Sequence, residues 1–367
     1  MKKILVSFGT RPEAIKLAPI IAEAKKRKIE VKVVVSGQHK EMLTPFLDFF
    51  EIVPDANLSI LKPNQSLADI TAAILAGMNP ILQKEKPDLV FVQGDTATTF
   101  ATALAAFYLK IPVVHIEAGL RTQDRYSPFP EEMNRLMVAR LADYHFAATE
   151  AARVNLQHEG IQENVFVTGN SGVDALRITL KRCPAPFGVG AVSLSGNENI
   201  YHRSVLITCH RRENHGQPLE EICDAIVRLA EQFPDVRFDF PVHLNPNVQT
   251  VVNAKLTKIP NVKLMAPLDY FQFVQKMVEC SVILTDSGGV QEEAPYLKKP
   301  IFVLRESTER QEGVDAGVAE LVGSDQDKIV ERVTRALTDA SYYQKFQQAV
   351  SPYGDGFAAE KIFNHLF

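Results

Sequence analysis

Short runs of apolar, β-branched residues alternate with longer segments of helical period along most of the chain. This alternation is typical of parallel sheets with helices on both faces, since a parallel connection has to cross the sheet and usually does so as a helix. We expect an α/β fold with eleven strands, at residues 3–8, 31–36, 89–93, 113–118, 144–150, 165–169, 204–209, 236–242, 262–267, 281–286 and 300–305.

Eleven strands are many for one such sheet, and 367 residues exceed the usual size of a single domain. We therefore predict two Rossmann-like domains, at residues 1–180 and 204–355. Residues 181–203 contain a stretch rich in Pro, Gly, Ser and Asn, which predicts a linker. The last segment, 356–367, has the pattern of a short amphipathic helix, and we expect it to pack back on the first domain.

The composition and the absence of certain motifs exclude several classes of function. The net charge of −4, without clustered Lys or Arg, disfavours nucleic acid as a partner. No run reaches the roughly 18 apolar residues of a membrane span, and the start lacks a signal-peptide pattern. The four cysteines form no CxxC pair, so we expect reduced thiols and a cytoplasmic protein. Because HExxH, GxGxxG and GxxxxGKS are all absent, we predict no catalytic metal, no nicotinamide and no P-loop.

Unusual polar clusters follow the expected strands almost every time. In open parallel sheets the carboxyl ends of the strands line the binding crevice, so clusters from both halves are predicted to face one cleft. Gly and polar residues also simply mark strand ends, an alternative that fits one cluster better than it fits seven. The clusters are 9–11, 37–39, 94–95, 117–119, 210–213, 243–245 and 286–289.

Two of these clusters suit a phosphate-bearing ligand. Ser287, Gly288 and Gly289 open a helix whose free amides and dipole favour a diphosphate, and a glutamate a turn later is able to bind ribose hydroxyls. The alternative is an ordinary Ser/Gly helix start. In the first half, Arg11 lies at a helix start with Lys16 about one turn further on, a cationic pair suited to phosphate unless Lys16 is merely solvated.

A set of carboxylates is predicted on the first domain. Asp95 and Glu117 follow strands, Glu131 opens a helix, and Arg135 lies one turn later on the same face. Buried carboxylates near one another have raised pKa values and transfer protons, although strand-end carboxylates are more often just solvated. In the second domain, His210 follows a strand directly and is placed to contact phosphate or move a proton.

The chain resembles the non-hydrolysing UDP-N-acetylglucosamine 2-epimerase family over nearly its full length. The motifs that carry this resemblance, in order, are FGTRPEAIKLAPI, VQGDTATTFATALAAFY, HIEAGLRT, YSPFPEEMNR, TGNSGVDAL, HRREN, PVHLNPNV, LTDSGGVQEEAP, TERQEGVDAG and PYGDG. The resemblance implies the GT-B fold, with the active site between two Rossmann-like domains, and a homodimer formed through the first domain. It also implies reversible inversion at C2 of UDP-N-acetylglucosamine by anti-elimination and re-addition of UDP, with no cofactor.

The resemblance also implies roles for single residues. It assigns the UDP phosphates to Arg11, His210, Ser287, Gly288, Gly289 and Arg310, and the ribose to Glu293. It assigns the acid/base steps to Asp95, Glu117 and Glu131, and makes Lys16 and Arg135 necessary for activity. A regulatory substrate position is matched by Gln38, Gln65, Arg211 and His243.

Some positions depart from the family pattern. Gln93 stands where relatives usually have His, and Cys209 replaces a small residue before His210. Asn64 and Glu41 differ near the regulatory position, which bears on the strength of substrate activation. Four other functions stay open from the residues alone: epimerisation of another UDP-amino sugar, a hydrolysing variant, a GT-B glycosyltransferase and a non-catalytic sugar-nucleotide sensor.

Overall fold

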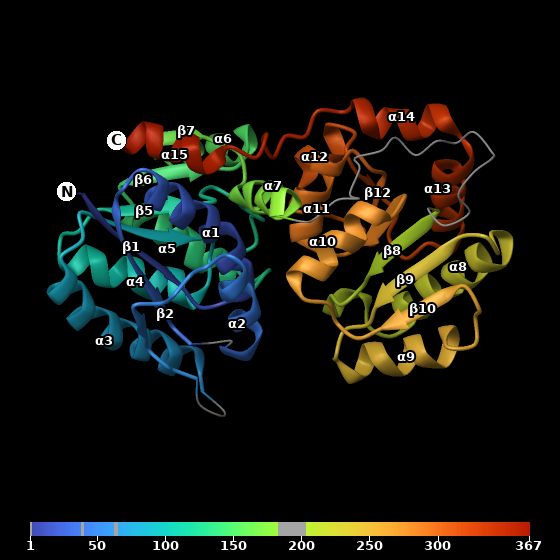
Figure 1. The fold of residues 1–367 in the computed structure, drawn as a ribbon, viewed down its shortest axis with the longest axis horizontal. Helices are drawn as coiled ribbons and strands as arrows, with labels where there is room; N and C mark the ends of the chain where they lie inside the picture. The colour runs from blue at the N-terminus through green and yellow to red at the C-terminus, as the bar shows by residue number, and fades with distance from the viewer. Residues whose placement is uncertain (1, 38–39, 62–64, 183–202) are drawn as a thin grey trace. The chain divides into compact units, whose positions relative to one another are not determined.

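The computed structural model describes residues 2–37, 40–61, 65–182 and 203–367 (Figure 1). The chain divides into two compact units, Met1–Ile178 with Tyr353–Phe367, and Thr179–Pro352. The predicted boundary at residue 180 falls inside helix α7 (Ser171–Arg182), so residues 181 and 182 continue a helix where a linker was expected. Residues 183–202 of the predicted linker lie outside the described residues, and Arg203 directly precedes β8.

The first unit is built on a seven-stranded parallel sheet in the order β3-β2-β1-β4-β5-β6-β7. The strands are β1 (Lys3–Phe8), β2 (Glu30–Val35), β3 (Ala56–Asn57), β4 (Leu89–Gln93), β5 (Val113–Ile116), β6 (Tyr144–Ala147) and β7 (Val165–Val167). The helices of this unit, besides α7, are α1 (Arg11–Lys26), α2 (Lys40–Phe49), α3 (Leu67–Glu85), α4 (Ala97–Tyr108), α5 (Glu131–Leu141), α6 (Glu150–His158) and α15 (Ala358–Leu366).

Successive strand residues bury their side chains on opposite faces of this sheet, because the side-chain period of a strand is two. Leu5, Val90 and Val92 belong to the core that packs against α3 and α4. Between the two valines, Phe91 faces the other way and stacks on Phe363 of α15, with ring centroids 5.8 Å apart. Both faces of the central strands are therefore covered, which explains their nearly continuous apolar sequence.

The second unit has a six-stranded parallel sheet in the order β10-β9-β8-β11-β12-β13. The strands are β8 (Ser204–Thr208), β9 (Arg237–Pro241), β10 (Val262–Met265), β11 (Val282–Thr285), β12 (Ile301–Val303) and β13 (Glu320–Leu321). The helices are α8 (Gln217–Gln232), α9 (Pro246–Leu256), α10 (Tyr270–Glu279), α11 (Gly288–Glu293), α12 (Gln311–Asp315), α13 (Gln326–Thr338) and α14 (Ala340–Gln348), with short 3-10 turns η1 (Arg212–Asn214) and η2 (Ala294–Leu297).

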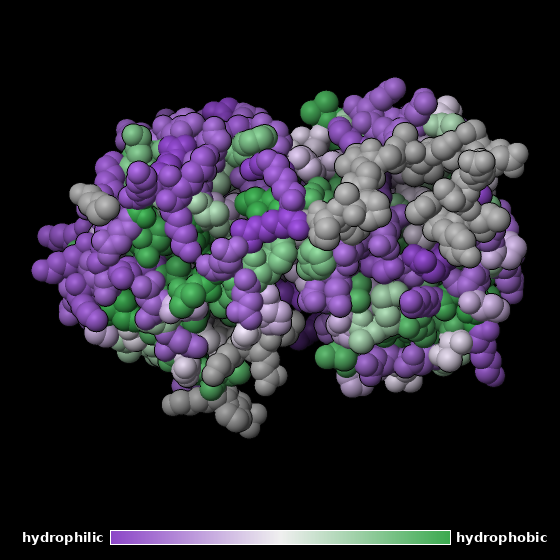
Figure 2. Space-filling model, viewed as in Figure 1, coloured by the Kyte–Doolittle hydropathy of each residue, from purple (hydrophilic) through white to green (hydrophobic). Residues whose placement is uncertain are grey.

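All eleven predicted strand segments form strands, and the structure adds β3 and β13. Each addition is a two-residue edge strand, too short to produce a readable apolar pattern. The cores of both units draw on strand and helix residues alike. Figure 2 shows mainly hydrophilic residues on the visible face, with apolar residues in separate patches between them.

The end of the chain returns to the first unit. Gly169 and Gly354 approach closely, so a Cβ on Gly169 would lie 3.0 Å from Cα of Gly354, and both have positive φ. Asp174 of α7 then accepts hydrogen bonds from the first amides of α15, Ala358 N at 3.0 Å and Ala359 N at 2.9 Å. These contacts fix the N-terminus of α15 to α7. Among the described residues, no helix is long and apolar enough to span a membrane.

Candidate active site

In both units the predicted site residues follow neighbouring strands at the carboxyl edge of the sheet. In the first unit β1, β4 and β5 are adjacent, and they are followed by Arg11 with Lys16, by Asp95 and by Glu117. In the second unit β9, β8, β11 and β12 are adjacent, and the residues that follow them are His243, His210, Ser287 with both glycines, and Arg310. Parallel strand order, which is not visible in the sequence, thus gathers each set at one edge.

Glu117 lies at the centre of the first set. Its backbone has a φ of 62°, a left-handed conformation that is uncommon outside glycine and concentrates at functional sites. Its carboxylate pairs with Lys16 and accepts a hydrogen bond from Gln93 Nε2, and Asn170 Nδ2 donates to Oε1 at 3.2 Å. Gln93 therefore supplies a donor to Glu117. Lys16 is a partner of Glu117, in place of the solvated alternative.

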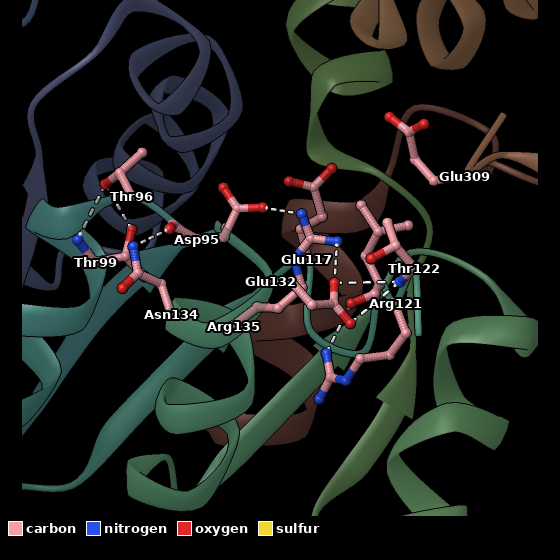
Figure 3. Close-up of polar contacts among 12 residues, drawn as sticks. Asp95, Thr96, Thr99, Glu117, Arg121, Thr122, Glu132, Asn134, Arg135 and Glu309 are labelled. Carbon is pink, nitrogen blue, oxygen red and sulfur yellow. Dashed lines mark hydrogen bonds and ion pairs between the residues drawn. The ribbon is translucent and has the colours of Figure 1, made fainter. Parts of the chain in front are cut away.

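Asp95 is held by helix α5 (Figure 3). Arg135 Nη2 donates to Asp95 Oδ2 at 2.6 Å, and Asn134 Nδ2 donates to the Asp95 carbonyl at 2.8 Å. The guanidinium also lies 3.2 Å from Glu132, which in turn accepts from the Thr122 amide. Arg135 was predicted on the same helix face as Glu131, and its ion pair within the helix is with Glu132. Glu131 Oε2 is buried and has no hydrogen-bond partner among the described residues.

Glu13 is a site residue that the sequence analysis missed. It is 2% exposed, and its carboxylate accepts from Gly9 N at 3.1 Å, Thr10 N at 2.8 Å and the Thr96 hydroxyl at 2.7 Å. Burial raises the pKa of Glu13, while the donated hydrogen bonds oppose that shift. Since Thr96 caps α4, Glu13 joins the starts of α1 and α4 beside Arg11 and Asp95. The spacing of Thr10 and Glu13 is that of a capping box, the one signal available in the sequence.

His115 is a core histidine that lies next to the first set of site residues. It is fully buried in β5, and its Nε2 lies 2.8 Å from the Gly94 carbonyl, directly before Asp95. Burial lowers the pKa of His115 to about 3, so the ring is neutral. Nδ1 has no partner in the described part of the chain, so the ring is satisfied on one side only.

In the second unit, Asp286 organises the residues after β8. Its side chain is fully buried and accepts hydrogen bonds from the amides of His210 and Arg211, each at 2.8 Å. Burial alone would raise the pKa of Asp286, but the nearby His210 ring and the two amides lower it to about 2. Asp286 stays ionised, and the turn carrying His210 and Arg211 is fixed by it.

His210 also stacks on His243, with ring centroids 5.6 Å apart and an interplanar angle of 26°. The Nδ1 of His243 accepts from the Asn245 amide at 3.1 Å. Burial and the neighbouring His210 ring lower the pKa of His243, which agrees with an accepting, neutral ring. The structure thus joins a predicted phosphate residue to a predicted regulatory residue.

Arg310 lies against the start of α11. Its Nε donates to Glu292 Oε1 at 2.7 Å, and its Nη1 pairs with Glu309. Burial would raise the pKa of Glu309, but Arg310 and Arg305 lower it to about 2. Gly288 leaves room for the guanidinium, because a Cβ there would lie 2.6 Å from its Cζ. Gly288 therefore admits the cation, a role that the sequence pattern did not suggest.

The remaining predicted residues have less defined surroundings. Glu293 is 8% exposed and accepts from the Tyr270 hydroxyl at 3.4 Å. Arg11 begins α1, and Gln65 precedes the N-cap of α3. Gln38 and Asn64 lie outside the described residues, as does the side chain of Glu41. Over the ranges that the structure describes, no group of three or more His, Cys, Asp or Glu is arranged to hold a metal ion.

Known proteins resemble this chain both in sequence and in three-dimensional structure. The curated UDP-N-acetylglucosamine 2-epimerase of Escherichia coli K12 is 49% identical over 99% of this chain and 98% of its own length. The crystal structure of the Neisseria meningitidis UDP-GlcNAc 2-epimerase bound to UDP-GlcNAc superposes with a TM-score of 0.89 at 46% identity, covering 99% of both chains. A co-structure of S. aureus MnaA with UDP gives 0.88 at 42% identity, covering 100% of this chain and 96% of the other.

Two parallel sheets with ligand-type residues at their carboxyl edges define an α/β protein of the GT-B class, as in these solved structures. A profile described as UDP-N-acetylglucosamine 2-epimerase matches residues 22–367. The chain therefore belongs to the UDP-N-acetylglucosamine 2-epimerase family, and it is an enzyme of the isomerase class.

Proposed function

We propose that this enzyme interconverts UDP-N-acetylglucosamine and UDP-N-acetylmannosamine without hydrolysing them. The observation that carries the proposal is a pair of carboxylates after adjacent strands, each against a cation: Glu117 with Lys16, and Asp95 with Arg135. The Neisseria structure contains bound UDP-GlcNAc and the S. aureus structure contains UDP, which supports a UDP-sugar substrate.

The reaction begins with departure of UDP. C2 has no adjacent carbonyl, so its proton is weakly acidic and direct deprotonation is slow. Breaking the C1–O bond places negative charge on the β-phosphate, and donors fixed before the reaction stabilise such charge. We assign this role to Arg11, His210, Arg310 and the amides of Ser287, Gly288 and Gly289, and we assign the ribose to Glu293.

Loss of the C2 proton together with UDP gives 2-acetamidoglucal. An anti-elimination followed by re-addition with the opposite configuration needs proton transfer on both faces of C2. We assign these transfers to Asp95, Glu117 and Glu131 as a group. Lys16 and Arg135 hold two of these carboxylates in fixed orientations. The buried Oε2 of Glu131, which has no partner in the described part of the chain, is able to accept a proton or a hydrogen bond from a substrate hydroxyl.

One NMR experiment tests the reaction. UDP-N-acetylglucosamine is incubated with the full chain in D2O, and C2 configuration, C2 deuterium and free UDP are followed together. We expect UDP-N-acetylmannosamine with deuterium at C2 and little free UDP. Free N-acetylmannosamine with stoichiometric UDP would show the hydrolysing variant, and product without deuterium would rule out the proton exchange. Turnover only on another UDP-amino sugar, or only with an acceptor, would identify the epimerase or glycosyltransferase alternatives.

We further propose substrate activation at a regulatory position formed by Gln38, Gln65, Arg211 and His243. The stacking of His243 on His210 supports a link between that position and the phosphate residues. The measurement is the dependence of UDP-N-acetylmannosamine turnover on added UDP-N-acetylglucosamine. A sigmoidal or strongly stimulated response is expected, and a hyperbolic response without stimulation would contradict the proposal.

We also propose a homodimer through the first unit. An apolar groove on α4 and α5 is lined by Phe100, Leu104, Leu136, Met137 and Leu141, and Phe107 and Tyr108 nearby are 55% and 64% exposed. A second copy would bury this surface. Leu104→Glu is expected to give monomers in analytical ultracentrifugation, whereas Val350→Glu, at an exposed residue of the other unit, should leave the dimer intact. A monomeric wild type would contradict the proposal.

The cellular role follows from the product. We propose a cytoplasmic enzyme that supplies N-acetylmannosamine-type sugars for surface polysaccharide synthesis. Cells lacking this chain are expected to lose such sugars from their surface polysaccharide and to recover them with the wild-type chain but not with a turnover-deficient variant.

A further inference from the structure

Asp286 presents its two carboxylate oxygens to different partners. Oδ2 accepts from the amides of His210 and Arg211, at 2.8 Å each, and from Asn214 Nδ2 at 3.0 Å. Oδ1 lies 3.0 Å from Nδ1 of the His210 ring. Three N–H donors converge on Oδ2, so none of them is directed at the oxygen that faces the imidazole, and the Cys209 thiol is a further neighbour of the carboxylate.

This division determines the protonation of the ring. An ionised carboxylate only accepts hydrogen bonds, so the Nδ1 facing Oδ1 has to carry a proton. Burial raises the pKa of Asp286, but the donated hydrogen bonds and the His210 ring bring it down to about 2, so the carboxylate is ionised at neutral pH. Nε2 is then the nitrogen that remains for a ligand. The His210 side chain is 39% exposed, whereas Asp286 is fully enclosed.

The ring is held on its face as well as at its edge. His243 stacks on it at 5.6 Å, and the Asn245 amide occupies Nδ1 of His243. The neutral His243 ring therefore has its proton on Nε2, the opposite arrangement to that of His210. The two stacked rings are thus held by different backbone and carboxylate contacts, and neither can exchange its tautomer without breaking one of them.

We propose that Asp286 is a positioning residue, which holds His210 with a proton on Nδ1 and reserves Nε2 for the phosphate that leaves in the proposed reaction. The assignment of Nε2 to phosphate rests on the proposed function. Asp286 also balances the imidazolium that forms when Nε2 takes up a proton from solvent water, as a buried carboxylate does in an Asp–His pair. The positive ring then faces the charge that develops on the phosphate.

The Asp286→Asn variant distinguishes control of the His210 tautomer from a purely structural role, in which Asp286 would only hold the turn in place. The three N–H donors on Oδ2 require an oxygen there, so the asparagine has to place its NH2 group where Oδ1 was. That NH2 faces His210 Nδ1, which then has to accept, and the neutral ring carries its proton on Nε2 instead. The turn keeps its hydrogen bonds while the tautomer of His210 is reversed.

The tautomer is measured directly by long-range 1H–15N correlation on the 15N-histidine-labelled full chain, at a pH where the imidazole is neutral. The His210 signals are assigned with His210→Gln. We expect the proton on Nδ1 in the wild type and on Nε2 in Asp286→Asn. A wild-type ring with its proton on Nε2 would overturn the proposal. The wild-type measurement requires neither enzymatic activity nor a variant that folds.

Kinetics supply the second readout. Turnover of Asp286→Asn is expected to fall on the order of 10²–10⁴-fold. The matched control is Asp239→Asn, a buried carboxylate of β9 that pairs with Arg237 at 2.8 Å and Lys276 at 3.2 Å. The control should lose stability but keep its turnover and the His210 tautomer. Turnover of Asp286→Asn within threefold of wild type would also overturn the proposal. A wild type without epimerase activity would contradict the proposed function alone.

Discussion

Arg310 lies so close to Gly288 that a Cβ at residue 288 would stand 2.6 Å from Cζ of the guanidinium. The same guanidinium donates to Glu292 at 2.7 Å and is 9% exposed. The missing side chain of residue 288 therefore allows a buried cation to lie at the start of α11. This relationship joins two residues 22 positions apart, both of which the family resemblance assigns to the UDP phosphates.

Gly288→Ala is expected to displace the Arg310 guanidinium and weaken UDP binding by about tenfold, roughly 1.4 kcal/mol. The fold should survive, since the far end of a flexible side chain can move. Isothermal titration with UDP measures the loss. Gly289→Ala is the matched control, because its Cβ would meet Glu293 Oε1 only at 3.8 Å. Equal losses in both variants would indicate that crowding of the ligand, and not displacement of Arg310, is responsible.

Asp95→Asn is expected to keep UDP affinity within about twofold and to lose on the order of 10²–10⁴-fold in turnover, the usual size of an acid/base contribution. Asparagine still accepts the hydrogen bond from Arg135, so the local structure is preserved. The control is Asp88→Asn at the opposite end of β4, where the carboxylate accepts from Lys3 N at 2.7 Å. If Asp95→Asn turns over at the wild-type rate, Asp95 takes no part in proton transfer.

Glu293→Gln tests the ribose assignment by a comparison of ligands. If Glu293 accepts from a ribose hydroxyl, UDP affinity should fall by roughly 1.5–3 kcal/mol, as for hydrogen bonds to charged groups. The analogue lacking that hydroxyl, either 2′-deoxy-UDP or 3′-deoxy-UDP, should bind both proteins equally. The double comparison removes any general effect of disturbing the buried contact between Glu293 and Tyr270. Equal losses for all three ligands would exclude a ribose contact.

Asp174 predicts a pH dependence of stability. Burial raises the pKa of Asp174 to about 6 in the folded state, from an ordinary 3.8. The folded state therefore holds this proton more tightly, so the contribution to stability is present below about pH 4 and is lost as pH rises through about 6. The expected loss is up to about 3 kcal/mol, since each pKa unit corresponds to roughly 1.4 kcal/mol.

The measurement is urea unfolding of wild type and Asp174→Asn between pH 4 and 7. The variant lacks this titration but loses one of the two hydrogen bonds to α15, about 1 kcal/mol at every pH. The stability difference, wild type minus variant, should therefore become smaller as pH rises. A difference that grows with pH would show that the two amides keep the Asp174 carboxylate ionised.

The apolar pattern predicted nearly all strands of both sheets, because buried parallel strands need continuous apolar sequence. The edge strands β3 and β13 were missed, since two residues do not establish a period. The boundary between the units was less predictable. Helix α7 runs through it to Arg182, and no local residue marks the point at which contacts shift from one unit to the other.

The site was predictable as a list of residues but less so as a set of contacts. The i, i+4 spacing of Glu131 and Arg135 favours an ion pair, yet the Arg135 guanidinium pairs with Glu132 and Asp95. The helix brings several carboxylates within reach of one cation, and the neighbouring strand end determines which of them it meets. Glu13 was not predicted, and Asp286 was predicted only as part of the strand-end cluster 286–289, because burial and multiple donors are tertiary properties.

The sequence by itself determined the α/β fold, the positions of polar clusters at strand ends and, through ordered motifs, the resemblance to a family, because these depend on periodicity and local residue order. Only the tertiary structure decided which groups meet. Lys16 reaches Glu117 across 101 positions and His210 reaches Asp286 across 76, contacts created by the order of strands in each sheet. Strand order depends on how whole elements pack, and short-range patterns carry little information about it.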